Sequence, residues 1–230
     1  MKQSNGKTGL TTLLVLFFLW LSLTVPAIAN ETRQDNFGAI ELYNKAVDAA
    51  SSGNFNDALN LTGEALAIQP NFTVALVTRA GVLIALDRPE EAEDTVNRAL
   101  VIDPANPSVL ATASSLYIKT GDHTKALTFA DTALDADPSL IEAWILKGTA
   151  HGALKEYPEE LNASKSALAL DPNNQLAKIN YDFAQSHITG QPESVSSDTS
   201  TTRAPVSLPV VILGILTGCT LIVRRIERER

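Results

Sequence analysis

Cysteine is almost absent from this chain, because Cys219 is the only one among 230 residues. A single cysteine cannot form an intramolecular disulfide, and it cannot supply a thiolate cluster for a metal ion. We therefore expect the folded part of the chain to be stabilised by side-chain packing alone.

Sequence motifs that carry catalysis are also missing. The chain contains no HExxH zinc motif, no GxSxG nucleophile turn and no glycine-rich phosphate loop. Its histidines, His123, His151 and His187, are far apart in the sequence and have no cysteine partner. We predict that the protein is not an enzyme and has no catalytic residue, metal site or cofactor.

Positive charge is scarce in the middle of the chain. Between Asn30 and Arg203 there are 12 Lys and Arg against 24 Asp and Glu, a balance of 12 − 24 = −12. Such a surface repels nucleic acid and anionic lipid head groups. We expect no nucleic-acid partner. Because the surface also repels anionic lipid head groups, any membrane attachment must come from an inserted segment.

The first 29 residues have the features of a secretory signal. Lys2 and Lys7 precede an apolar run over residues 10–25, and the small-x-small sequence Ala-Ile-Ala follows at 27–29. A basic start, an apolar centre and such a site predict a signal peptide over 1–29. The alternative is an uncleaved membrane anchor, and in both cases the chain is exported.

A second apolar run, residues 206–223, contains no charged residue. As a helix it would be about 27 Å long, close to the thickness of a bilayer core, and four arginines follow within 224–230. Arginines beside a spanning helix remain on the cytoplasmic side. We predict a single-pass transmembrane helix over 206–223 and a cytoplasmic tail over 224–230; a buried core helix is the alternative.

The segment before this run is rich in Ser, Thr and Pro. Residues 188–205 contain few large apolar side chains, so they cannot bury enough surface to offset the loss of chain entropy. We predict a flexible linker here, acting either as a plain spacer or as an O-glycosylated stalk.

The remaining part of the chain repeats itself. Similar sequences, ALAIQP, ALVIDP, ALDADP and ALALDP, end at Pro70, Pro104, Pro138 and Pro172, and 104 − 70 = 34 gives the step. The step defines units over 39–72, 73–106, 107–140 and 141–174, preceded by a lead-in over 30–38 and followed by a helix over 175–187.

Equivalent positions of the units, numbered 1 to 34, carry equivalent side chains. Position 27 is alanine in every unit and position 28 is leucine. Small residues occupy position 8 as Ala46, Ala80, Ser114 and Gly148. Position 20 is alanine in three units, and Glu160 breaks the pattern in the fourth.

This pattern resembles the tetratricopeptide repeat (TPR) family. The resemblance implies an all-α, helix-turn-helix solenoid of about four repeats with a C-terminal capping helix, separate from the transmembrane helix. Small residues at fixed positions let paired helices approach closely, which supports the same fold. A helical array of another repeat family is the alternative.

Turn and cap residues agree with helix pairs. Asn106 and Asn174 are expected to cap the helices that follow them, and Ser139 with Glu142 forms a capping-box pattern. Between the paired helices, glycine suits a left-handed turn residue in units 1 and 3. Asp87 and Lys155 occupy that position in units 2 and 4, so we expect looser turns there.

The TPR resemblance implies that a protein or peptide binds in the concave groove lined by the first helix of each unit. The corresponding candidates are Ile40, Tyr43, Val47, Val74, Val77, Ile84, Ala111, Thr112, Ile118, Lys119, Ile145, Thr149 and Leu176. These side chains are mostly apolar, so the groove suits an apolar helix or extended segment. The alternative is that many of them pack between units.

One known type of TPR ligand is not expected. Family members that clamp the C-terminal carboxylate of chaperones use lysines, asparagines and an arginine on this surface. The matching positions here hold Tyr43, Val47, Thr78, Ser108 and Thr112. We therefore expect no chaperone-tail clamp.

Four Asn-x-Ser/Thr sequons lie in the exported part and are candidate glycosylation sites. They begin at Asn30, Asn60, Asn71 and Asn162.

These features together predict a membrane-anchored, non-catalytic scaffold for protein–protein interactions. Its repeat domain lies outside the cytoplasm, extracellular or periplasmic, and its C-terminus is cytoplasmic. Two alternatives remain open: an accessory subunit of an envelope enzyme or secretion complex, and a cell-surface structural protein whose C-terminal tail is processed by a sorting enzyme.

Overall fold

The computed structural model describes residues 37–190, and all regular structure in this part is helical. The first helix covers residues 37–51. It is followed by α2 (Phe55–Ile68), α3 (Thr73–Ala85), α4 (Pro89–Ile102), α5 (Pro107–Thr120), α6 (His123–Ala136), α7 (Ile141–Ala153), α8 (Tyr157–Leu170) and α9 (Gln175–Thr189). The all-α prediction is confirmed, and α9 continues two residues beyond the end expected for the capping helix.

Several predicted segments lie outside the described residues. These are the signal peptide (1–29), most of the lead-in, the linker beyond residue 190, the transmembrane helix (206–223) and the basic tail (224–230). Within residues 37–190, no helix combines the length and hydropathy needed to span a bilayer.

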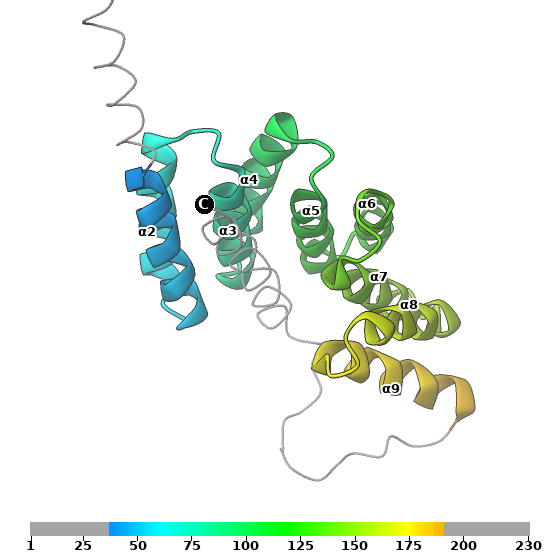
Figure 1. Ribbon diagram of the computed structural model, residues 1–230. Helices are drawn as coiled ribbons and strands as arrows, with labels where there is room; N and C mark the ends of the chain where they lie inside the picture. Colours follow the sequence, from blue (N-terminus) through cyan, green and yellow to red (C-terminus); the bar gives the residue numbers. More distant parts are fainter. Residues whose placement is uncertain (1–36, 191–230) are drawn as a thin grey trace, which may run out of the picture.

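The helices stack as pairs along a curved path from α2 to α9 (Figure 1). Each helix packs on the next one in the sequence, and α3, α5, α7 and α9 also contact one another in series. The first helices of the units therefore form one continuous layer, which we call the inner layer, and the even-numbered helices form the outer layer.

The second helix of each unit ends in the same way because of the proline at position 32. The residue before each proline has left the helical conformation, and Asp137 and Asp171 are extended, with φ of −142° and −136°. Proline excludes the α region for the residue that precedes it and cannot donate a hydrogen bond to continue the helix. The repeated proline thus fixes the length of each unit.

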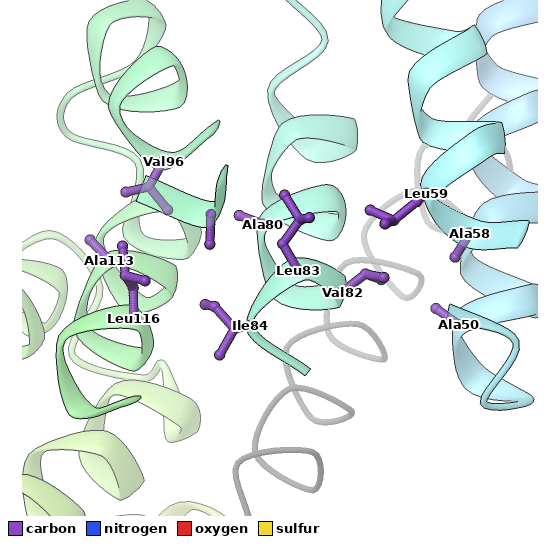
Figure 2. Close-up of a cluster of buried hydrophobic side chains, with 11 residues drawn as sticks. Ala50, Ala58, Leu59, Ala80, Val82, Leu83, Ile84, Val96, Ala113 and Leu116 are labelled. Atoms are coloured by element: carbon purple, nitrogen blue, oxygen red, sulfur yellow. The ribbon is translucent and has the colours of Figure 1, made fainter. Parts of the chain in front are cut away.

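Alanine and leucine fill the spaces between helices. Every alanine at position 27 is at most 2% exposed, so the helix backbones approach each other closely at this point. The largest core cluster joins units 1 to 3, and Val82, Leu83 and Ile84 of α3 lie in it between side chains of α2 and α5 (Figure 2). One unit alone could not bury this surface, which is why the array is a single core.

All turns within the units use a left-handed residue. Gly53 and Gly121 have φ of 78° and 87°, and Asp87 and Lys155 have φ of 59° and 64°. The Arg88 and Glu156 amides, which follow Asp87 and Lys155, each donate to a carbonyl of the preceding helix at 2.9 Å. The Asn54 amide after Gly53 donates to the Ala49 carbonyl in the same way, at 2.8 Å. The expectation of looser turns is therefore wrong, because Asp87 and Lys155 close their turns as Gly53 does, at the cost of a non-glycine residue in this conformation.

The predicted helix caps are correct in two places and wrong in one. The Asn106 side chain accepts from the Ser108 and Val109 amides, and Asn174 accepts from the Ala177 amide. The Ser139 capping box does not form. Both the amide and the hydroxyl of Ser139 donate to Asp137 Oδ1, at 2.9 and 2.7 Å, so the serine is held in a turn before the helix.

Candidate partner-binding face

The structure divides the thirteen candidate groove residues into two groups by burial. Seven are buried against neighbouring helices: Tyr43, Val47, Val77, Ile84, Ala111, Thr112 and Ile145. The other six remain partly accessible: Ile40, Val74, Ile118, Lys119, Thr149 and Leu176. We call the surface made by these six and by α9 the inner face.

The buried group joins successive units. Tyr43 and Val47 of the first helix pack with Val77 of α3, and Ile145 of α7 packs with Ala177 of α9. Tyr43 also lies against Phe72, with ring centroids 5.3 Å apart. These side chains hold the inner layer together. The alternative given from the sequence, that many of the groove candidates pack between units, is therefore correct for these seven.

The accessible group comes from five helices of the inner layer. Ile118 of α5 and Leu176 of α9 pack on the buried Leu146 while staying partly open to solvent. The Lys119 ammonium forms an ion pair of 2.8 Å with Asp87 in the preceding turn. The inner face is thus mainly apolar, and its one lysine among the candidates is already paired.

The last helix adds an exposed apolar residue that sequence reasoning missed. Ile179 in α9 is 48% exposed and lies three residues, about one helical turn, after Leu176. Continuing the 34-residue numbering into α9 would have identified it, because Ile179 falls at position 5, a contact position in the family. The four full units end at residue 174, so Ile179 lies beyond them.

Polar groups fix α9 against the inner layer. The Asn180 side chain donates to Thr149 Oγ1 at 3.0 Å and is 3% exposed. Two other inner-layer hydroxyls, of Thr78 and Ser115, are buried without a hydrogen-bond partner among the described residues. Individual polar side chains are therefore buried beneath the mainly apolar inner face.

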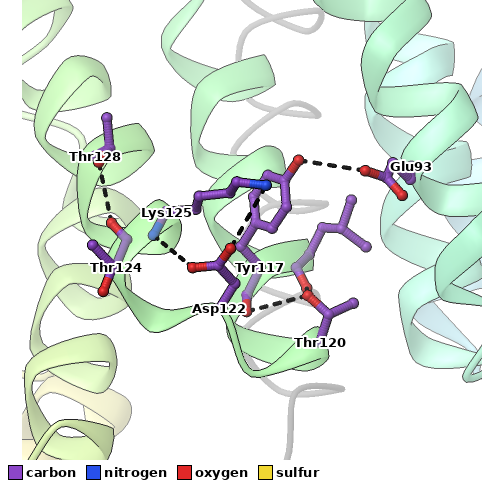
Figure 3. Close-up of polar contacts among 8 residues, drawn as sticks. Glu93, Tyr117, Thr120, Asp122, Thr124, Lys125 and Thr128 are labelled. Atoms are coloured by element: carbon purple, nitrogen blue, oxygen red, sulfur yellow. Dashed lines mark hydrogen bonds and ion pairs between the residues drawn. The ribbon is translucent and has the colours of Figure 1, made fainter.

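A polar and aromatic cluster links units 2 and 3 near the turn between α5 and α6 (Figure 3). The Tyr117 ring stacks on Phe129 at 5.5 Å, and its hydroxyl donates to Glu93 at 3.5 Å. The Lys125 ammonium lies 4.8 Å from the centre of the Tyr117 ring and 3.6 Å from Asp122. These contacts are accounted for by unit packing.

The histidines also have structural partners. His151 Nδ1 is 2.7 Å from Glu156 Oε2, and the His187 ring stacks on Tyr157 with centroids 4.4 Å apart. Among residues 37–190, no group of three or more His, Cys, Asp or Glu side chains is placed to hold a metal ion.

Burial shifts the pKa of Glu142 and of Arg79. Burial raises the pKa of the Glu142 carboxyl, and Asp137 nearby adds to the shift. Burial lowers the pKa of Arg79, whose guanidinium donates to the Leu59 carbonyl at 2.8 Å and so joins α3 to α2.

Three of the four sequons fall on described residues. Asn60 and Asn162 are exposed on the outer-layer helices α2 and α8, and Asn71 is exposed before α3. Asn30 lies outside the described residues. Glycosylation at all four remains a prediction.

Comparison with known families decides the identity of the repeats. One tetratricopeptide repeat profile matches residues 49–111, and a second matches residues 107–140. The chain is a tetratricopeptide repeat protein. TPR proteins of this all-α type serve as scaffolds for protein–protein interaction, and the resemblance stated from the sequence is confirmed.

Related proteins match only in part. A Protein SGT1 homolog of Oryza sativa subsp. japonica is 32% identical over 95 residues, covering 41% of this TPR chain and 25% of the relative. The Hsp70-Hsp90 organizing protein of Triticum aestivum is 28% identical over 85 residues, covering 37% of this chain and 15% of the relative. The chain thus spans a quarter or less of the length of these two relatives.

Solved structures share the fold. The pilF structure of Pseudomonas aeruginosa has a TM-score of 0.62 and 17% sequence identity, covering 68% of this chain and 72% of that one. This likeness concerns the helical array.

Proposed function

We propose that this TPR protein is a membrane-anchored, outward-facing and non-catalytic scaffold whose inner face binds one apolar segment of another exported protein. The proposal rests on the exposure of apolar side chains along the inner layer. Partly accessible apolar residues from its successive helices lie at the positions where the family binds peptides.

The chemistry of the inner face favours an apolar helix or extended segment as the ligand. Ile118, Leu176 and Ile179 offer apolar contact on α5 and α9, and Ile118 and Leu176 rest on a buried core that is already formed. A preformed apolar surface binds the apolar side of an amphipathic segment by filling contacts between side chains.

A chaperone tail is a poor ligand for this face. The name of one relative refers to Hsp70 and Hsp90. In this chain, however, the five positions that match the carboxylate clamp carry no cationic side chain, and Tyr43, Val47, Thr78 and Thr112 are buried. The array therefore lacks the positive charge that a terminal carboxylate requires.

Membrane attachment and orientation are supported by the sequence. The apolar run 206–223 followed by arginines favours a single crossing with the C-terminus in the cytoplasm, and the signal over 1–29 favours export. The Ser/Thr/Pro-rich linker would hold the array away from the bilayer.

Chemical cross-linking of the full-length protein in intact cells tests the scaffold proposal. We expect a defined protein partner to be recovered with the wild type and lost with Ile179→Asp, because a charge there disrupts the apolar contact. The matched control is Val101→Asp on α4, where the side chain is 85% exposed, and it should keep the partner. Equal recovery from both variants would contradict binding at the inner face.

Protease added to whole cells tests the orientation separately. In cells with an outer membrane, the protease is added after that membrane is opened. Degradation of the repeat domain with survival of the C-terminal tail is expected, and a fully protected repeat domain would contradict it.

A further inference from the structure

The fourth unit contains a buried carboxylate where the other units have alanine. Position 20 is Ala58, Ala92 and Ala126 in units 1 to 3, each fully buried in the close contact between paired helices. In unit 4 it is Glu160 on α8, which is only 3% exposed. A glutamate is much larger than the residue it replaces, so something must make room for it.

Gly152 of α7 makes that room. A Cβ atom built on Gly152 would lie 2.6 Å from Glu160 Oε1 and 2.7 Å from Oε2. The carboxylate therefore occupies the space of the missing side chain. Gly152 is at position 12, one of the contact positions of the family, and it is partly accessible. The carboxylate of an outer-layer helix thus reaches through to an inner-layer contact position.

No group among the described residues neutralises this carboxylate. Glu160 Oε2 is buried without a hydrogen-bond partner, and Glu160 forms no ion pair with a described residue. Two side chains of the flanking helix α7 have partners elsewhere, since Lys147 pairs with Asp131 and His151 Nδ1 lies 2.7 Å from Glu156 Oε2. Burial alone raises the pKa of Glu160 to about 7.

We propose that Glu160 and Gly152 form a binding site for one cationic side chain, arginine or lysine, of the segment held on the inner face. This proposal rests on the proposed function. An unpaired buried carboxylate gains most from a cation that supplies hydrogen bonds, and an arginine fork matches its two oxygens. The glycine leaves the approach from the inner face free of a side chain.

A purely structural role predicts something different. Filling the space beside Gly152 needs the volume of Glu160 but not its charge, and glutamine has the same shape. If Glu160 only fills space, Glu160→Gln leaves the binding of cations unchanged. If it is a cation site, the same substitution removes the charge and the binding with it.

The test uses the full-length protein in lipid nanodiscs, labelled with ¹⁵N-glycine. The probe is Nα-acetyl-arginine methylamide, with the citrulline analogue as a neutral match of the same shape. At pH 8 we expect a saturable shift of the Gly152 amide signal with arginine, with a Kd on the order of 1 mM, and none with citrulline. Equal shifts from both probes would overturn the proposal.

Variants identify the residue responsible. Glu160→Gln should weaken arginine binding at least tenfold, and Gly152→Ala should do the same because its Cβ displaces the carboxylate. Glu156→Gln, on the exposed glutamate one turn earlier, is the matched control and should bind like the wild type. Retained binding in Glu160→Gln, or equal loss in Glu156→Gln, would count against the site.

The wild-type protein provides a second test that needs no variant of Glu160. Because its carboxyl has a pKa of about 7, the ionised fraction falls about tenfold between pH 8 and pH 6, and arginine binding should fall with it. The flanking helices α7 and α9 carry His151 and His187, and the variants His151→Gln and His187→Gln are expected to keep the same fall if Glu160 is the group responsible. Binding that does not change with pH would overturn the proposal.

The two proposals can fail independently. If Ile179→Asp releases the cellular partner while arginine does not bind at Glu160, only the cation site is wrong. If arginine binds at Glu160 while Ile179→Asp keeps its partner, the site exists and the apolar inner face is not the binding surface.

Discussion

At the scale of single residues, Glu160 is the strongest departure from the repeat pattern. The sequence shows that it interrupts the alanines at position 20, but not what accommodates it. Gly152 lies eight residues earlier, across the turn between α7 and α8, and only the packed structure brings it beneath the carboxylate. The two deviations from the repeat therefore compensate for each other.

The raised pKa of Glu160 predicts how stability depends on pH. The group has a pKa of about 7 when folded and about 4.5 when unfolded, so the folded state holds the proton more tightly. The ionised carboxylate therefore lowers the free energy of unfolding. This loss is absent below pH 4.5, grows as the pH rises to 7 and is constant above that, where it reaches about 3 kcal/mol. Denaturant unfolding should show this loss in the wild type and not in Glu160→Gln. Parallel pH profiles would contradict the assignment.

The contact between Gly152 and Glu160 predicts non-additive mutations. Gly152→Ala in the wild type forces the carboxylate aside and should destabilise by about 1–3 kcal/mol. In a Glu160→Ala background the same change should stabilise by about 0.5–1 kcal/mol, because alanine favours the helix and nothing opposes its Cβ. A double-mutant cycle of unfolding free energies measures the difference. The same sign in both backgrounds would show that the two residues do not interact.

At the scale of helices and turns, the sequence predicted ends more reliably than beginnings. Proline at position 32 acts through fixed local geometry, so each second helix ends where expected. The Ser139 cap failed because Asp137 competes for the same donors two residues earlier. A sequence lists both acceptors, and only the backbone conformation decides which one is used.

The left-handed turns predict opposite effects of glycine substitutions. Lys155 has a φ of 64° and is exposed, so Lys155→Gly should stabilise by about 0.5–1 kcal/mol by relieving the conformation. Gly121→Ala, at a φ of 87°, should destabilise by about 1 kcal/mol. Thermal or denaturant unfolding followed by circular dichroism measures both. A destabilised Lys155→Gly would mean that the lysine side chain makes a contact that outweighs the strain.

At the scale of the whole molecule, the sequence predicted the array and its register but not the extent of the inner face. The positions that contact ligands in the family also lie between units, and burial depends on how closely neighbouring pairs pack. Val77 and Ile84 are 2% and 1% exposed, whereas Ile118 at the same position as Ile84 stays partly open. The repeat pattern alone predicts the same exposure for both isoleucines.

The contacts of Leu146 between units predict which part of the array a core substitution destabilises first. Leu146 of α7 is fully buried between units 3 and 4, so Leu146→Ala should cost about 2–4 kcal/mol. Because each unit contacts only its neighbours, the loss should appear first in α7, α8 and α9. Hydrogen exchange followed by mass spectrometry should show faster exchange there than in α2 and α3, with Val101→Ala as an unaffected control. Uniform acceleration would indicate a fully cooperative array.

The account as a whole depends on the inner face being the surface that meets a partner outside the cytoplasm. The most direct test places a photo-reactive amino acid at Ile118 or Ile179 and, for comparison, at Asn60 or Val101 on the outer layer, in living cells. The account predicts that both inner-face positions cross-link to the same exported protein and that the outer-layer positions do not. Cross-links to that protein from the outer-layer positions alone would contradict it.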